Sequence, residues 1–440
     1  MTGSRAQRSG LDLGPLEAAL RSWEASPLEA LIRSVPPDVA ATPADLAAAG
    51  VALFDDRLTF PQMTISWPAV SANVAIMQRF CDAAGAWLAP HGKTTMAPHI
   101  FEVQLRAGAW AITVATARQA LTCRAFGIPR VLVANEITHR GEIRRLVSEL
   151  AADPTFELMI LVDDPGNASD WAAAARAAKL GRPVRLLVEH GFPNGRTGTR
   201  DRAGLGRVVD AIVDGRPWVE LFGIEGYEGI APGQTAEELE QAAVDYLDSL
   251  AAAARWILPR FTVDRPLVSA GGSVYFDRVV ERLGRSALPD FQLVLRSGGY
   301  VTHDDGYYKR LSPLSSASDR LPGMDRLRPA LVLWGVTVSR PEQDLAILGF
   351  GHRDAPSRID PPVARWHAGG GTLTDIEPGV RIRRMDDQHA YLDLDGRFDP
   401  SIGDFVGCGI SHPCEAFERW RLMLALNDAR RVVGLIPTFF

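Results

Sequence analysis

The chain has 440 residues, a length at which two domains are the usual arrangement. Its net charge is −6 at pH 7, and a phosphate backbone demands a basic surface, so we expect no nucleic-acid partner. The sequence contains no apolar run of the roughly 18 residues that cross a bilayer, and it opens on no signal-peptide pattern. The four cysteines show no paired framework. We therefore expect a cytoplasmic protein that makes no contact with a membrane.

The first segment has the apolar spacing of a helix. The pattern runs over residues 12–34, and Pro36 and Pro37 then interrupt it. We assign residues 1–45 to an N-terminal helical extension outside the main fold.

Short, apolar, β-prone runs then alternate with longer stretches of helical pattern, such as 98–107, 117–126 and 236–256. This alternation predicts a parallel sheet with helical crossovers. Eight repeats predict its closure into a (β/α)8 barrel within residues 46–330, with an open doubly wound sheet as the alternative. The expected strands are 86–89, 111–115, 131–134, 158–162, 184–189, 221–225, 267–269 and 291–295.

The rhythm changes after residue 330. Glycine-rich turns at 349–351, 369–371 and 393–396 separate short strand-like runs, and no long helical pattern intervenes. We therefore expect a smaller, mainly β domain over residues 331–440. A strand from residues 50–66 is a candidate to pair with it.

In a barrel, chemistry is placed in the loops that follow the strands. The loop after the first expected strand contains Lys93, and the loop after the second contains Thr116. A desolvated lysine there would have a lowered pKa and an amine available for Schiff-base chemistry, whereas a solvated surface lysine is the plain alternative. Lys179 and Lys309 are the only other lysines, and Lys179 lies before a strand, at the wrong end of a barrel.

Two further motifs suit ligands. Gly271, Gly272 and Ser273 follow the seventh strand, where barrels hold phosphate on backbone N–H groups, although the same residues also suit a plain turn. His412 and Cys414 are one residue apart and can point at one ion, because imidazole and thiolate are both good zinc ligands. A buried cysteine and an ordinary turn histidine are the alternative.

These motifs together resemble a known family. The stretches 91–94 (His-Gly-Lys-Thr), 108–116, 226–229 (Gly-Tyr-Glu-Gly) and 412–414 (His-Pro-Cys) are similar to the D-threonine aldolase and D-serine dehydratase group. That group belongs to the fold-type III, alanine racemase-like enzymes that depend on pyridoxal 5'-phosphate. The similarity runs from about residue 50 to the C-terminus. It implies a (β/α)8 barrel followed by a β domain.

The resemblance also implies residue roles. Lys93 would carry the cofactor, with His91 tuning it, and a divalent metal, zinc or else manganese, would lie on His412 and Cys414. His389 resembles a position near the metal and would act in acid–base chemistry or orient the ligands, unless it is a surface histidine. The implied cofactor contacts are Lys93, Thr116, Arg196, Tyr227, Gly271, Gly272, Ser273 and Tyr300.

The implied activity is loss of water from a β-hydroxy D-amino acid, followed by release of ammonia and a 2-oxo acid. Lys93 would remove the α-proton while the metal polarises the β-hydroxyl. Aldolases of the group tend to have aspartate where Cys414 stands, which favours a dehydratase over retro-aldol cleavage to glycine and an aldehyde. A racemase would need no metal, and a non-catalytic cofactor carrier would need no second domain. The resemblance further implies a homodimer.

Overall fold

The computed structural model describes residues 10–28, 41–377, 379–396 and 398–440. The chain divides into two compact units. Unit 1 contains the described residues of 1–16, 77–93 and 104–298. Unit 2 contains those of 17–76, 94–103 and 299–440.

Unit 1 is built on an eight-stranded sheet whose paired strands are all parallel, in the order β2-β9-β8-β7-β6-β5-β4-β3. Backbone contacts join its two ends, because Trp110 N–H donates to the Leu88 carbonyl and His91 forms a bridge with Thr113. The sheet therefore closes into a (β/α)8 barrel, as the alternating pattern predicted. Its strands are β2 (Trp87–Leu88), β3 (Ile112–Val114), β4 (Arg130–Glu136), β5 (Glu157–Val162), β6 (Val184–Glu189), β7 (Val219–Glu225), β8 (Leu267–Ala270) and β9 (Gln292–Leu295).

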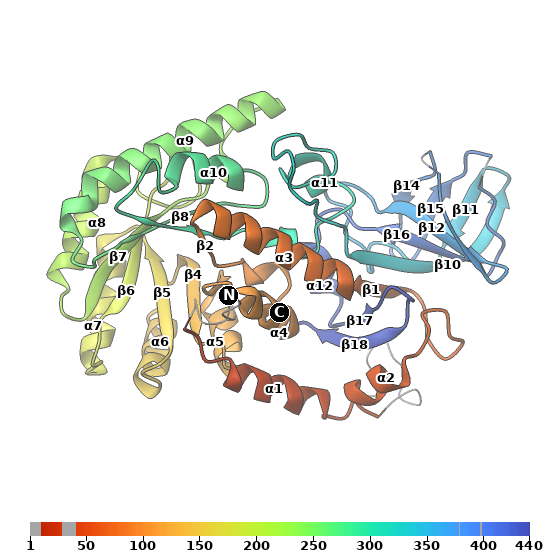
Figure 1. Cartoon of the computed structure of the whole chain (residues 1–440), viewed down its shortest axis with the longest axis horizontal. Helices are drawn as coiled ribbons and strands as arrows, with labels where there is room; N and C mark the ends of the chain where they lie inside the picture. Colours follow the sequence, from red (N-terminus) through yellow and green to blue (C-terminus); the bar gives the residue numbers. More distant parts are fainter. Residues whose placement is uncertain (1–9, 29–40, 378, 397) are drawn as a thin grey trace. The chain divides into compact units, whose positions relative to one another are not determined.

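Helices cover the outside of this barrel (Figure 1). Several begin where a polar side chain accepts a hydrogen bond from the first turn, as Asp164 does for α7 and Thr235 does for α9. The barrel helices are α5 (Ala117–Ala125), α6 (Arg140–Ala152), α7 (Pro165–Ala177), α8 (Arg202–Asp214), α9 (Ala236–Ile257) and α10 (Phe276–Leu283).

The barrel strands are almost continuous apolar runs because side chains on both faces are buried. Leu132, Met159, Leu187 and Val294 form one cluster inside the barrel, and each is fully buried. Covered sheets of this kind favour branched and long aliphatic residues at successive positions. This pattern explains why all eight strands could be located in the sequence.

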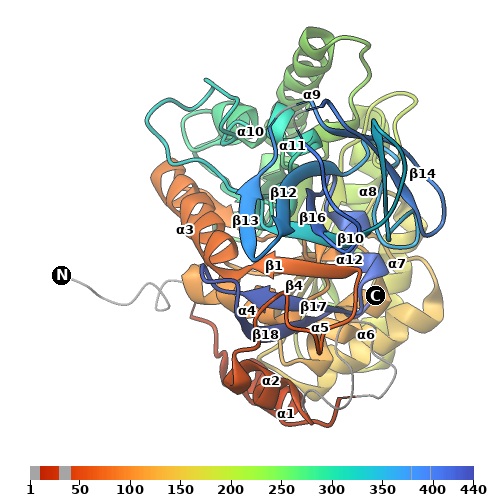
Figure 2. The ribbon, with the colours of Figure 1, turned by 90° about the vertical axis from the view of Figure 1, so that its right-hand side faces the viewer.

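Unit 2 is built on a ten-stranded sheet, part of which follows the order β13-β12-β16-β10-β1-β17-β18 (Figure 2). Strand β1 (Gln62–Ser66) lies between β10 and β17 in this sheet. Leu46, Leu58, Trp334 and Leu424 pack together in its core. The other strands are β10 (Leu331–Glu342), β11 (Leu345–Leu348), β12 (Val363–Gly369), β13 (Thr372–Asp375), β14 (Arg381–Met385), β15 (Ala390–Asp393), β16 (Phe405–Gly409), β17 (Leu422–Leu426) and β18 (Val432–Pro437).

The remaining helices are α1 (Gly14–Glu24), α2 (Pro43–Ala49), α3 (Trp67–Ala84), α4 (Pro98–Ala107), α11 (Tyr307–Leu311) and α12 (Cys414–Arg419). The helix predicted over 12–34 is confirmed only in part: α1 covers Gly14–Glu24, residues 25–28 are not helical, and the predicted part beyond residue 28 lies outside the described residues. None of the helices in the described ranges is long and apolar enough to span a membrane.

Candidate functional site

The carboxyl ends of the barrel strands carry several buried charged side chains of unit 1. Glu189 and Glu225 are the last residues of β6 and β7, and Arg296 directly follows β9. All three are at least nine-tenths buried. Parallel strands place their carboxyl ends at one mouth of the barrel, so the mouth is charged although its walls are apolar.

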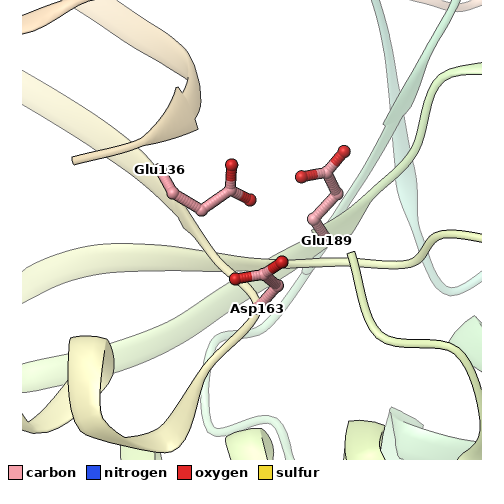
Figure 3. Close-up of side chains that lie close together, drawn as sticks. All are labelled: Glu136, Asp163 and Glu189. Atoms are coloured by element: carbon pink, nitrogen blue, oxygen red, sulfur yellow. The ribbon is translucent and has the colours of Figure 1, made fainter. Parts of the chain in front are cut away.

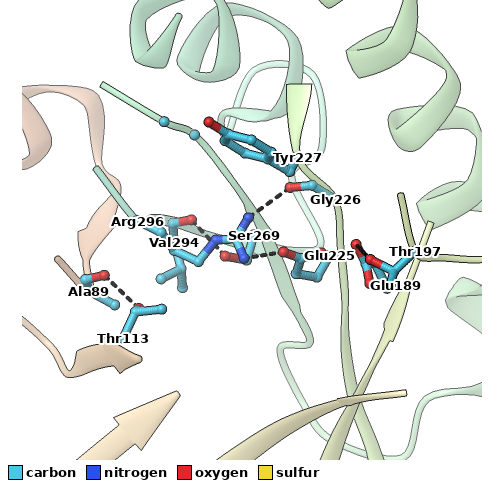
Figure 4. Close-up of polar contacts among 12 residues, drawn as sticks. Ala89, Thr113, Glu189, Thr197, Glu225, Gly226, Tyr227, Ser269, Val294 and Arg296 are labelled. Atoms are coloured by element: carbon cyan, nitrogen blue, oxygen red, sulfur yellow. Dashed lines mark hydrogen bonds and ion pairs between the residues drawn. The ribbon is translucent and has the colours of Figure 1, made fainter. Parts of the chain in front are cut away.

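Arg296 and Glu225 form a buried ion pair (Figure 4). Nη1 of Arg296 donates to Oε1 of Glu225, and Nη2 donates to the Gly226 carbonyl at 2.8 Å. Burial raises the pKa of Glu225 to about 7, and the neighbouring guanidinium of Arg296 opposes that rise. Nε of Arg296 and Oε2 of Glu225 are buried without a hydrogen-bond partner among the described residues.

His91 lies near three cationic side chains. Burial lowers its pKa well below the ordinary value, and the positive charges of Lys93, Arg296 and Arg196 lower it further. The ring is therefore neutral near pH 7. Its Nδ1 is buried and meets no hydrogen-bond partner in the described structure. An anionic ligand would be attracted by these cations.

Lys93 stands in a 3-10 turn, Gly92–Thr94, just after β2. The turn matches the predicted loop at the barrel mouth. However, the Lys93 side chain is exposed, so the single chain does not provide the desolvation that the sequence pattern predicted. Its neighbours in the turn, Gly92 and Thr94, are both buried, so the exposure is confined to the Lys93 side chain.

Three of the predicted cofactor contacts, Arg196, Tyr227 and Thr116, already interact with other residues of unit 1. The Arg196 guanidinium lies 5.6 Å from the centre of the Tyr227 ring, within the range of a cation–π contact. Thr116 is exposed, and its side chain caps helix α5 by accepting a hydrogen bond from Gln119 N–H at 3.2 Å. These positions place Tyr227 after β7 and Thr116 after β3, on loops at the barrel mouth.

The predicted phosphate loop already binds a carboxylate. Gly271 N–H and Gly272 N–H donate to the two side-chain oxygens of Glu228, at 3.0 and 2.8 Å. Glu228 begins a 3-10 turn, Glu228–Ile230, and is only 1% exposed. Ser273, the third predicted contact, is buried.

A cluster of three carboxylates follows neighbouring strands. Glu136 ends β4, Asp163 follows β5 and Glu189 ends β6, and their ligand oxygens lie within 4.8 Å of one another (Figure 3). Burial and the two neighbouring carboxylates raise the pKa of Glu136 to about 10, so this carboxyl is protonated near pH 7. Within the described ranges, this is the one group of three or more acidic, histidine or cysteine side chains close enough to hold a metal ion.

The two predicted metal ligands belong to unit 2. His412 is in a left-handed conformation, with φ of 60°, and its N–H donates to Asp304 at 2.9 Å. Its Nδ1 is buried and lacks a hydrogen-bond partner, although Glu415 stands 3.6 Å away. Cys414 begins helix α12, and its Sγ lies 3.6 Å from Oγ1 of Thr94. Burial lowers the pKa of His412, which favours the neutral ring that a metal requires.

The other two predicted residues of unit 2 differ in burial. Tyr300 is 1% exposed in the 3-10 turn Gly299–Val301. His389 is exposed in the turn between β14 and β15, where its carbonyl accepts a hydrogen bond from Asp386 N–H at 2.8 Å.

Arg296 follows the eighth strand predicted from the sequence, in a loop where polar residues were expected, whereas three acidic residues of the barrel mouth belong to none of the motifs recognised in the sequence: Glu136, Glu189 and Glu225. One signal was nevertheless present. Glu189 and Glu225 each end an otherwise apolar strand, and a charge at the carboxyl end of a barrel strand is a functional candidate.

The sequence matches two domain families. Residues 65–276 match the family described as alanine racemase, N-terminal domain, and residues 330–426 match the family described as "Putative serine dehydratase domain". A comparison with curated proteins gave no match.

Solved structures share the fold over most of the chain. D-threonine aldolase from Filomicrobium marinum is 22% identical, with a TM-score of 0.71 over 90% of this chain and 98% of that one. D-threo-3-hydroxyaspartate dehydratase from Delftia sp. HT23 is 20% identical, with a TM-score of 0.67 over 87% and 98%. An alanine racemase-like protein from Idiomarina loihiensis is 15% identical, with a TM-score of 0.67 over 86% and 96%.

Proposed function

Because residues 65–276 match the alanine racemase N-terminal domain family, residues 330–426 match the putative serine dehydratase domain family, and the fold is alanine racemase-like, we propose that this chain is a pyridoxal-phosphate-dependent lyase acting on a β-hydroxy D-amino acid. The reaction would remove water and then release ammonia and a 2-oxo acid. Pyridoxal phosphate and a divalent metal would both take part.

The barrel mouth of unit 1 fits an anionic aldehyde cofactor. The observation that supports the proposal is that His91 lies near three cationic side chains, of which Lys93 would supply an amine and Arg196 and Arg296 would supply positive charge. Nδ1 of His91 and Nε of Arg296 are buried polar atoms without partners among the described residues, and a ligand would satisfy them. When bound, pyridoxal phosphate withdraws electrons from the α-carbon of the amino acid joined to it.

Residues of the barrel would hold and orient this cofactor. Lys93 would supply the amine that joins the aldehyde, and the same amine would accept the α-proton. The buried ion pair with Glu225 holds the Arg296 guanidinium in one orientation. The Nε atom of Arg296, which has no partner among the described residues, would therefore donate to a ligand from a fixed position. His91, neutral at pH 7, can accept or donate one hydrogen bond without adding charge.

In unit 2, His412 and Cys414 would hold the metal. Imidazole and thiolate form a donor set that suits zinc, and the buried Nδ1 of His412 has no hydrogen-bond partner in the described chain to compete with a metal. Such a metal acts as a Lewis acid on a hydroxyl group. One solved structure of D-threo-3-hydroxyaspartate dehydratase, a protein of the same fold, is described as a metal-free form.

The choice of dehydration over retro-aldol cleavage is supported by the second domain. The match to the serine dehydratase domain covers residues 330–426 and so includes both His412 and Cys414. Cysteine at position 414 also agrees with the dehydratases of the resembling group rather than with its aldolases.

The test is a panel of D- and L-β-hydroxy amino acids assayed in parallel for ammonia, aldehyde and the inverted stereoisomer, with and without a chelator. We expect ammonia from a D-substrate and its loss on chelation. Aldehyde release would replace the proposal with an aldolase. Inversion that is insensitive to the chelator would replace it with a racemase.

A further inference from the structure

One buried carboxylate at the barrel mouth has no part in the chemistry above. Glu228 lies in the 3-10 turn after β7, and only 1% of its surface is exposed. Its two oxygens accept hydrogen bonds from Gly271 N–H at 3.0 Å and Gly272 N–H at 2.8 Å. A carboxylate that is buried to this degree persists only where donors compensate its lost hydration.

The donors come from a loop whose backbone is shaped to bind an anion. Gly271 has φ of +106°, a conformation that side-chain-bearing residues rarely adopt. Successive N–H groups of such a loop point toward one concavity, which is the arrangement that binds phosphate in many proteins. Here the first two donors of the loop bind the protein's own carboxylate. Burial raises the pKa of Glu228, and the two backbone hydrogen bonds oppose that rise.

The loop is also fixed from its other sides. Ser297 donates from its hydroxyl to the Gly272 carbonyl at 2.6 Å. A Cβ atom at position 272 would lie 3.1 Å from the Tyr227 ring, so the ring packs directly against the backbone there. The peptide between Gly271 and Ser273 is therefore held by Glu228 through its N–H groups and by Ser297 through its carbonyl.

We propose that Glu228 is a positioning residue for the cofactor phosphate. By binding the N–H groups of Gly271 and Gly272, its carboxylate holds the glycine loop in the conformation that presents the next residue, the buried Ser273, to the phosphate. The phosphate then contacts the loop from Ser273 onward and does not displace the carboxylate, because displacement would leave a buried charge without partners. This inference rests on the proposed function, since it requires a phosphate-bearing cofactor.

A competing arrangement makes the opposite prediction. If the phosphate used the N–H groups of Gly271 and Gly272 itself, Glu228 would compete with the cofactor for them. Removing the charge of Glu228 would then strengthen binding. The sign of the change in affinity therefore separates a positioning residue from a competitor.

The experiment titrates cofactor-free protein with pyridoxal 5'-phosphate and, separately, with pyridoxal, which lacks the phosphate, and follows the visible absorbance of the adduct. The variants are Glu228→Gln and, as a matched control, Glu237→Gln, an exposed glutamate of helix α9. We expect Glu228→Gln to raise the Kd for pyridoxal phosphate at least about tenfold, because a neutral amide loses a charge-assisted hydrogen bond and turns an N–H toward one of the donors. The Kd for pyridoxal should change by less than about twofold, and Glu237→Gln should change neither.

Tighter binding of pyridoxal phosphate by Glu228→Gln, or an equal loss for both ligands, would overturn the inference. If Glu228→Gln does not fold, Ser297→Ala provides the second variant. It removes the hydroxyl that holds the Gly272 carbonyl, and a smaller but equally phosphate-selective loss is expected. A wild-type protein that binds neither ligand would overturn the proposed function itself, whereas binding that is unchanged in both variants would overturn only the role of Glu228.

Discussion

Arg296 donates to Glu225 inside the barrel, and only 5% and 2% of the two side chains are exposed. The pair joins the carboxyl ends of β7 and β9, which are not neighbours in the sheet. Each charged group has lost most of its hydration, so each needs the opposite charge of its partner to offset the cost of burial. Removal of one partner would leave the second buried and uncompensated.

Glu225→Gln should therefore destabilise the protein by about 2–4 kcal/mol, measured as the free energy of unfolding in urea. The matched control is Glu220→Gln in the same strand. Glu220 pairs with Arg185 at 3.3 Å, but 34% of Arg185 is exposed, and such pairs contribute about 1 kcal/mol or less. Equal losses in the two variants would contradict the dependence of Arg296 on Glu225.

The carboxylate cluster predicts a pH dependence of stability. The pKa of Glu136 is about 10 in the folded protein, above its ordinary value of 4.5. Between these two values the folded state retains a proton that the unfolded state releases, so a rise in pH lowers stability through this group. Glu136→Gln keeps the shape of the protonated carboxyl but does not titrate.

The stability gained by Glu136→Gln over the wild type should therefore increase as the pH rises from about 5 to about 9, reaching the order of 1 kcal/mol or more. Urea denaturation at a series of pH values measures it. Glu142→Gln, an exposed change on helix α6, should show no such trend. A gain that is constant with pH would mean that Glu136 is not protonated in the folded protein.

The apolar runs of the barrel strands were sufficient to locate all eight strands, because covered parallel strands are buried on both faces. Charged residues at strand ends were harder to assign. The strand predicted at 131–134 continues to Glu136 after an irregularity in its pairing with β5, and this places Glu136 in the carboxylate cluster rather than in a loop. The part of the site that could not be predicted depends on contacts between residues far apart in the sequence. The hydrogen bond from Gly272 N–H to Glu228 joins residues 44 positions apart, and neither local motif predicts it.

The covalent attachment of the cofactor can be tested at Lys93. Borohydride reduction after incubation with pyridoxal phosphate should trap an adduct that peptide mass spectrometry places at residue 93. Lys93→Ala should abolish the visible absorbance and the trapped adduct, because the Schiff base cannot form at position 93 without the amine.

Lys179→Ala is the matched control, since Lys179 is exposed just after helix α7 and before strand β6. It should leave both signals unchanged. Trapping at residue 179 or 309 in the wild type, with residue 93 unmodified, would refute the assignment. The trapped adduct can be assigned to one residue without ambiguity, because the chain has only these three lysines.

The metal ligands can be tested by comparing two histidines of unit 2. His412 is partly buried, and its Nδ1 lacks a hydrogen-bond partner among the described residues, whereas His389 is exposed in a hairpin turn. His412→Ala and Cys414→Ser should each lose bound metal, since a hydroxyl is a much weaker zinc ligand than a thiolate. Ammonia release should fall at least about tenfold, while the cofactor absorbance is retained.

His389→Ala should keep its metal, because an exposed ring in a turn is poorly fixed to serve as a ligand. Elemental analysis of the purified variants measures metal content, and added zinc should restore activity to chelated wild type but not to His412→Ala. Full metal content in Cys414→Ser together with loss of metal in His389→Ala would move the site to the β14–β15 turn. Residues 330–426 would then hold a metal through side chains other than those of the His-Pro-Cys motif.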